Sequence, residues 1–219
     1  MSVTDSLPLF PLGVVLYPHA RVQLHIFEPR YRDLVAFCLE YDEAFGVILF
    51  EEGDMADVGC TARIERVAAQ YEDGNMDIVV RGERRFRLLE TRQERTYLTA
   101  SVELLHDESQ SLQRDLKERA ITQHMKLLEL AGRTVRPSLY QDVSDVSFVM
   151  AHNAGLTVHQ KQKVLELSGE NDRIAYLVSH FEELIPQVEQ MEDIRRKVRS
   201  NGYFPDFPLD ENSDGTTDE

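Results

Sequence analysis

The sequence predicts an α+β protein, in which a small β-barrel of about six to seven strands with one inserted helix is followed by an α-helical bundle. Up to about residue 105, apolar residues recur mostly with the two-residue period of strands, and turn signals separate the short segments. After His106 the period lengthens to that of helices. We therefore expect a barrel over residues 1–105, a helical bundle over 106–203 and a disordered acidic tail over 204–219.

The predicted strands show where the sheet should turn and bend. Residues 98–104 alternate apolar and polar side chains throughout, as a strand with one buried face does. Asp73-Gly74 favours a tight hairpin, because both residues tolerate a positive φ. The strand before this hairpin changes the parity of its apolar residues near Glu65 and Arg66, which predicts a β-bulge or a sharp bend there. Bends of this kind let a sheet curl into a barrel.

Helical periodicity appears once among the strands and then throughout the second half. The inserted helix should begin near Pro29 and bury one stripe formed by Tyr31, Leu34, Val35, Cys38 and Leu39. The later helices are expected over Leu112 to Gly132, over Ser138 to Asn153, from the capping box of Thr157 and Gln160 to Gly169, and from Ile174 toward Arg199 with Pro186 inside.

The composition limits which cellular compartment and which binding partners we expect. The net charge of −15 and the pI near 4.9 argue against nucleic acid, because binding to it depends on phosphate neutralisation by Lys and Arg. Cys38 and Cys60 are the only cysteines, which fits a reducing compartment. No signal-peptide pattern and no run of roughly 18 apolar residues is present. We expect a cytoplasmic protein that does not enter the membrane.

Several motifs in order resemble one known family. The opening residues 7–34 are similar to the start of the Lon protease substrate-binding domain, which also occurs as a stand-alone bacterial protein. The most specific match is Ile26 to Tyr31, which reads IFEPRY as in the stand-alone branch. Further matches are Val58-Gly59-Cys60 with Ala62 and Ile64, Asp73-Gly74, Gly82 with Arg85-Phe86, residues 161–167, and Asp172-Arg173-Ile174 with Leu177.

This resemblance covers about residues 7–200 and implies both a fold and a function. The implied fold is a PUA-like β-barrel with a helical extension, which agrees with the periodicity. The implied function is recognition of unfolded or hydrophobic polypeptide segments, with an adaptor role toward a protease as one use. The chain lacks the phosphate loop of the Lon ATPase, with no Gly-Lys pair anywhere, and lacks the Ser-Lys protease domain. We therefore predict no enzymatic activity and no cofactor.

The candidate peptide-binding residues are Phe10, Tyr17, His19, Phe27, Glu28, Arg30, Tyr31 and Arg85. Aromatic side chains beside prolines can form a shallow groove, supplemented by hydrogen bonds at a strand edge, or they can cover the end of the barrel. Glu28 can equally cap the helix that Pro29 starts, while Tyr31 packs beneath it. No residue is assigned a catalytic role.

Two other interpretations remain open at this point. Arg81, Arg85 and Arg87 should share the solvent face of one strand, where they could bind an acidic or phosphate-bearing ligand, including RNA as in other PUA-like proteins. A small-molecule enzyme whose site is assembled from distant residues is the other alternative. Metal binding is not predicted, because the spacing of His19 and His25 matches no ligand motif. The oligomeric state stays undetermined.

Overall fold

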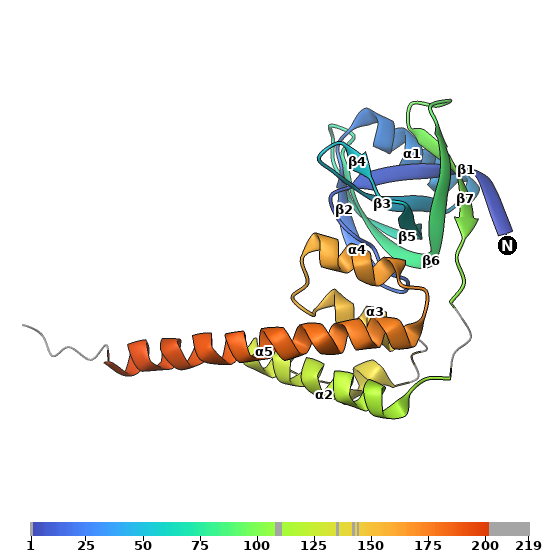
Figure 1. Ribbon diagram of the computed structural model, residues 1–219. Coiled ribbons are helices and arrows are strands. Elements are labelled where there is room, and N and C mark those ends of the chain that lie inside the picture. The colour runs from blue at the N-terminus through green and yellow to red at the C-terminus, as the bar shows by residue number, and fades with distance from the viewer. Residues whose placement is uncertain (1, 108–110, 135, 142, 144, 202–219) are drawn as a thin grey trace, which may run out of the picture.

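The computed structural model describes residues 2–107, 111–134, 136–141, 143 and 145–201. Within these ranges, strands from the first half of the chain form a barrel, and helices from the second half lie against one end of it (Figure 1). The α+β architecture expected from periodicity is therefore confirmed. The tail expected over 204–219 lies outside the described residues, as does part of the linker that follows Asp107.

Seven strands of the described residues form the barrel. Its ring runs in the order β1, β7, β6, β5 and β3, and a parallel pairing of β3 with β1 closes it. Strand β2 adds to β6 outside this ring, and β4 extends β3 as a short hairpin. The strands are β1 (Ser2–Leu12), β2 (Arg21–Ile26), β3 (Phe45–Glu51), β4 (Asp54–Met55), β5 (Val58–Gln70), β6 (Met76–Arg92) and β7 (Leu98–Leu104).

The predicted hairpin and bulge both occur in the β5–β6 pair. Strand β5 ends just before Asp73-Gly74, and Gly74 has a φ of 84°, so the turn uses the left-handed conformation expected of it. The β5–β6 register shifts between Ile64 and Arg66, where the apolar parity changes. This bulge lets β5 and β6 curve around the barrel.

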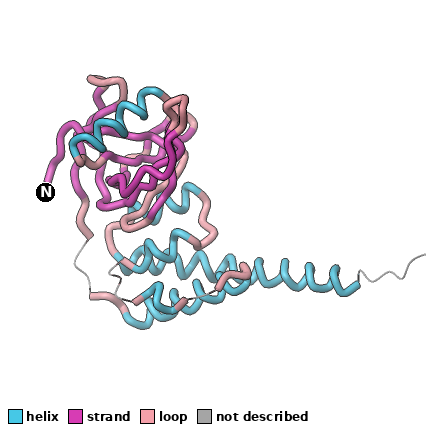
Figure 2. Tube along the Cα trace, turned by 180° about the vertical axis from the view of Figure 1, so that it is seen from behind, coloured by secondary structure: helices cyan, strands magenta, loops and turns pink. Residues whose placement is uncertain are grey.

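Helix α1 (Pro29–Tyr41) lies across the end of the barrel that faces away from the other helices, as Figure 2 shows from behind. It buries four residues of the expected stripe, including Cys38, against the barrel core. Leu39, expected on the same stripe, is instead 48% exposed. Burial raises the pKa of the Cys38 and Cys60 thiols to about 12, so both are packed and unreactive groups at neutral pH.

The second half contains α2 (Arg114–Leu130), a 3₁₀ helix η1 (Pro137–Tyr140), α3 (Val146–His152), α4 (Val158–Glu166) and α5 (Glu170–Asn201). The capping box of Thr157 and Gln160 is present and starts α4. A single helix over Ser138 to Asn153 was the wrong expectation, because η1 and α3 share that segment. Asp145 stands at the N-cap of α3, and Asp favours caps over helix interiors. Helix α5 continues through Pro186.

The helices share one apolar core, which reaches into the barrel end. Helices α2 and α5 run parallel along each other, joined by the ion pairs Arg119–Glu182 and Lys126–Glu189. The C-terminal part of α5 projects beyond the other helices (Figure 1). Tyr17 and Val58 of the barrel belong to the core of the helical half, so the two halves are packed together. Among the described helices, none is long and apolar enough to span a membrane.

Candidate functional site

A groove of about 330 Å³ opens where β1 and β2 end, α1 begins and β3 turns back into β4. Five of the eight predicted binding residues line it, and most of the other lining side chains are apolar. The lining residues are Phe10, Pro11, Leu12, His25, Phe27, Glu28, Arg30, Tyr31, Phe50, Met55 and Leu98. The structure thus brings residues 10–12 at the end of β1 and the IFEPRY segment together at one site.

The IFEPRY segment forms one wall because a strand changes into a helix within it. Ile26 ends β2 and is buried in the barrel, so strand alternation turns Phe27 outward, where it is 59% exposed. Pro29 then starts α1, whose first turn hydrogen-bonds to the backbone carbonyl of Glu28. The Glu28 side chain does not cap the helix, so the alternative role considered for it from the sequence is wrong. It accepts a hydrogen bond from Arg30 Nε at 2.9 Å.

The floor of the groove is a cluster of packed aromatic rings that are tilted against one another. Phe10 and Tyr31 are buried with their ring centroids 4.0 Å apart, and Phe45 lies 6.1 Å from Phe10 on the core side. The guanidinium of Arg30 lies 4.6 Å above the Tyr31 ring, a cation–π contact that fixes it at the rim. A rigid floor of this kind binds a ligand without first having to order its own side chains.

Two aromatic side chains at the groove remain in solvent. Phe50 at the end of β3 is 42% exposed and lies in the same groove as Phe27. Residues 45–49 of β3 are buried, but Phe50 near the end of this strand is not, so its ring is left uncovered. Exposed apolar residues gathered in a concave site are typical of surfaces that bind other molecules.

One polar cluster borders the groove. His25 Nδ1 lies 2.7 Å from Asp77 Oδ1, and the Tyr71 hydroxyl donates to Asp77 Oδ2 at 2.9 Å. Hydrogen bonds from His25 and Tyr71 lower the pKa of Asp77. The cluster orients the His25 ring, whose centroid lies 6.0 Å from that of Phe27. None of the described lining residues is a Ser, Cys or Lys, so the site offers contacts for binding and no side-chain nucleophile of those types.

Tyr17 and His19 lie elsewhere, where the barrel meets the helices. The Tyr17 ring stacks 5.3 Å from Phe148 of α3, and its hydroxyl donates to the Lys161 carbonyl at 3.0 Å. Burial raises the pKa of Tyr17. His19 is exposed in a wider depression beside Arg81 and Arg84. Tyr17 therefore joins the two halves of the molecule and does not face the groove.

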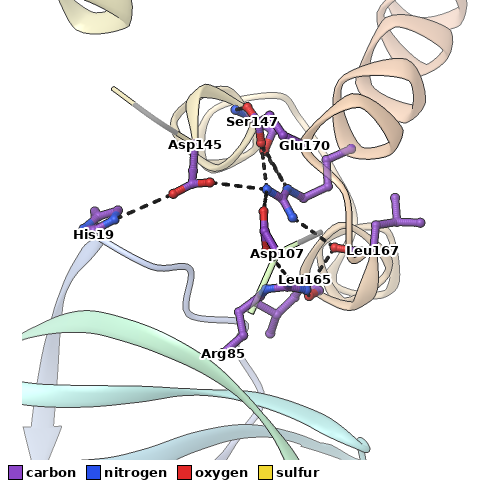
Figure 3. Close-up of polar contacts among 9 residues, drawn as sticks. His19, Arg85, Asp107, Asp145, Ser147, Leu165, Leu167 and Glu170 are labelled. Carbon is purple, nitrogen blue, oxygen red and sulfur yellow. Dashed lines mark hydrogen bonds and ion pairs between the residues drawn. The ribbon is translucent and has the colours of Figure 1, made fainter. Parts of the chain in front are cut away.

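Arg85 occupies the same junction and is 3% exposed, so the expectation of an exposed basic face is wrong for this residue. Its guanidinium donates to the carbonyls of Leu165 at 2.8 Å and Leu167 at 2.9 Å, and it forms an ion pair with Asp107 (Figure 3). Burial lowers the pKa of Arg85, but an arginine stays charged at neutral pH. The RNA interpretation thereby loses a central member of its basic cluster.

The junction has a second buried arginine that the sequence interpretation did not assign. Arg173 of α5 is fully buried, forms ion pairs with Asp107 and Glu170, and donates a hydrogen bond to the Leu167 carbonyl. Burial by itself would lower its pKa, but these acceptors outweigh it and the pKa of Arg173 is raised. The sequence does contain a sign of this role. Arg173 stands four residues before Leu177, so it lies on the apolar stripe of α5, where a charged side chain is unusual.

Three carboxylates at the junction could at first suggest a metal site. Oxygen atoms of Asp107, Asp145 and Glu170 lie within 4.8 Å of one another. The guanidinium of Arg173 lies among them and supplies the positive charge, with Asp145 Oδ1 3.5 Å from it. This arrangement is an ion-pair network that joins the barrel to the helices, and it leaves the groove as the candidate binding site.

A closed β-barrel with a helical extension and an aromatic groove beside the start of α1 defines a binding domain. Comparison with known proteins identifies the family. The model of the ATP-dependent protease La (LON) substrate-binding domain matches residues 6–183, and the chain belongs to this family. Among solved structures, the Lon N-terminal domain protein from Xanthomonas campestris is 29% identical, with a TM-score of 0.64 over 80% of this chain and 98% of that one.

Further relatives agree with this assignment. The N-terminal domain of Mycobacterium avium complex Lon protease has the same fold, with a TM-score of 0.59 at 18% identity over 81% of this chain and 98% of that one. The Lon protease of Flavobacterium johnsoniae is 26% identical and that of Escherichia coli K12 is 25% identical, each over 89% of this chain. This chain spans about a quarter of their length, 26% and 27% respectively.

Proposed function

We propose that this chain recognises unfolded or apolar polypeptide segments in the groove and does so without catalysing a reaction. The observation that carries the proposal is the pair of exposed aromatic side chains, Phe27 and Phe50, above a rigid floor of Phe10 and Tyr31. Leaving such rings in water is unfavourable, and a bound apolar side chain would remove them from it. Membership in a substrate-binding domain family supports the same role.

The proposed role includes a partner that degrades or receives the bound segment. The relatives named above are Lon proteases, of which this chain matches only the N-terminal quarter or so. We propose that the chain delivers its client to such a protease or keeps the client from aggregating. None of the described lining residues belongs to α2 or α5, so a client could occupy the groove while these helices contact another protein.

Titration with an unfolded model polypeptide tests the groove directly. Fluorescence anisotropy should show saturable binding to the protein, and a folded form of the same polypeptide should not bind. Phe27→Ala should weaken binding by about tenfold, because it removes a large exposed ring from the contact. Ile194→Ala is the matched control, since Ile194 is 53% exposed on the projecting part of α5. Equal binding by both variants and the unchanged protein would place recognition elsewhere.

A further inference from the structure

We infer that the groove prefers apolar segments flanked by Lys or Arg over those flanked by neutral or acidic residues. This inference rests on the proposed function, since it names the class of polypeptide that the same groove binds. The feature behind it is the charge of the β3–β4 hairpin, which forms one wall. Phe50 and Met55 of this hairpin line the groove, and the residues from Glu51 to Asp57 read EEGDMAD, with four acidic residues and no basic one; none of these four acids is among the described lining residues.

The hairpin places apolar and acidic side chains next to each other. Phe50 and Met55 are opposite one another in the β3–β4 register, and both line the groove. The next pair along the hairpin is Glu51 with Asp54, and Glu52 stands at the tip between them. All three acidic residues are exposed. Strand alternation turns Glu51 and Asp54 to the face of the hairpin opposite Phe50 and Met55, so these carboxylates act on a bound client through their electric field and not by direct contact.

Little positive charge nearby compensates these carboxylates. Among the salt bridges of the described residues, Glu51 pairs with His159 at 3.6 Å, and no Lys or Arg pairs with Glu52, Asp54 or Asp57. Elsewhere in the groove, Glu28 and Arg30 neutralise each other at 2.7 Å. The rim is thus negative within a chain of net charge −15. Such a field attracts basic segments, repels acidic ones and weakens as salt is added.

The tip of the hairpin provides a variant that separates charge from folding. Glu52 has a φ of 54° and Gly53 a φ of 95°, the two positive angles of a type I′ turn. Asn adopts this conformation more readily than Glu, so Glu52→Asn removes a charge and relaxes the backbone. A loss of binding in this variant could not be attributed to an unstable hairpin.

The inference can be tested with three peptides. They share one apolar core of Phe, Leu and Ser and differ only in their flanking residues, which are Lys, Ser or Glu. At low salt, the Lys-flanked peptide should bind about tenfold more tightly than the Ser-flanked one, and the Glu-flanked peptide most weakly. High salt should reduce these differences. The double variant Glu52→Asn with Asp54→Asn should reduce the Lys preference severalfold, while its affinity for the Ser-flanked peptide stays unchanged.

The matched control removes the same charge at a distance. Asp115→Asn with Glu118→Gln changes two exposed acidic residues of α2, at the opposite end of the molecule (Figure 1), and should keep the full Lys preference. If both double variants reduce the preference equally, net charge governs it and the inference fails. If the Lys- and Ser-flanked peptides bind the unchanged protein equally at low salt, the inference fails and the proposed function stands. If no peptide binds, the proposed function fails as well.

Discussion

The groove end of the barrel leaves aromatic side chains in water, whereas the end that meets the helices buries two arginines with their guanidinium groups fully engaged. Phe27 is 59% exposed and Phe50 is 42% exposed, while Arg85 and Arg173 share Asp107 and donate to backbone carbonyls at the end of α4 and in the α4–α5 connection. Exposed apolar groups are available to another molecule. The hydrogen bonds and ion pairs of these two buried arginines instead connect parts of the same chain to one another.

This difference predicts where substitutions affect stability most. Arg173→Met should lower the free energy of unfolding by about 2–3 kcal/mol, because it removes a fully buried guanidinium that donates charge-assisted hydrogen bonds to Asp107, to Glu170 and to the Leu167 carbonyl. Urea denaturation followed by circular dichroism measures the loss. Arg119→Met is the control, since Arg119 forms an exposed ion pair with Glu182 and should cost less than about 1 kcal/mol.

If the two variants lose similar stability, the buried ion-pair network contributes no more to stability than an exposed ion pair does. The comparison between the two ends of the barrel would then no longer hold.

The helical core beyond the junction should respond to pH. His124 is fully buried, its Nδ1 lies 2.8 Å from the Tyr140 hydroxyl, and its ring stacks on Phe181. Burial lowers the pKa of His124 to about 4, from about 6.5 in the unfolded chain. Between these values the unfolded state binds more protons, so stability falls as pH is lowered from about 6.5 to 4, by about 3 kcal/mol in total.

Denaturation at several pH values checks this dependence against His124→Gln, which keeps a polar partner for Tyr140 and cannot titrate. The variant should show a smaller loss of stability across the same interval, after the difference at neutral pH is subtracted. The same slope in both proteins would mean that other groups cause the acid sensitivity.

The sequence predicted those parts of the molecule that depend on local patterns. Alternation identified residues 98–104 as a strand, the change of parity located the bulge near Glu65 and Arg66, and the Thr157 capping box marked the start of α4. Such features depend on neighbours a few residues away, which a single sequence displays. The expected helix 138–153 is interrupted where Asp145 forms the N-cap of α3, and the apolar residues on either side of it match helical periodicity too closely for the pattern alone to show this break.

The candidate site was predicted only in part, because its residues meet through the fold. The IFEPRY segment and Phe10 were named, but Phe50 and Met55 come from a hairpin that pairs beside them only once the barrel closes. Arg85 was expected in solvent, since strand alternation cannot show that α4 covers that face. Which face of a strand is covered by a distant helix is a tertiary property that local periodicity does not contain.

The smallest effect on stability is expected at the groove, and it would separate the two ends most clearly. Phe50→Ser should change the free energy of unfolding by less than about 0.5 kcal/mol, because the ring is already 42% exposed and lies at the end of β3. Phe10→Ala in the buried floor should instead cost about 3–5 kcal/mol. Thermal or urea denaturation distinguishes the two. A large loss for Phe50→Ser would mean that this ring supports the barrel, and the groove would then lose one of the two exposed side chains on which its proposed function depends.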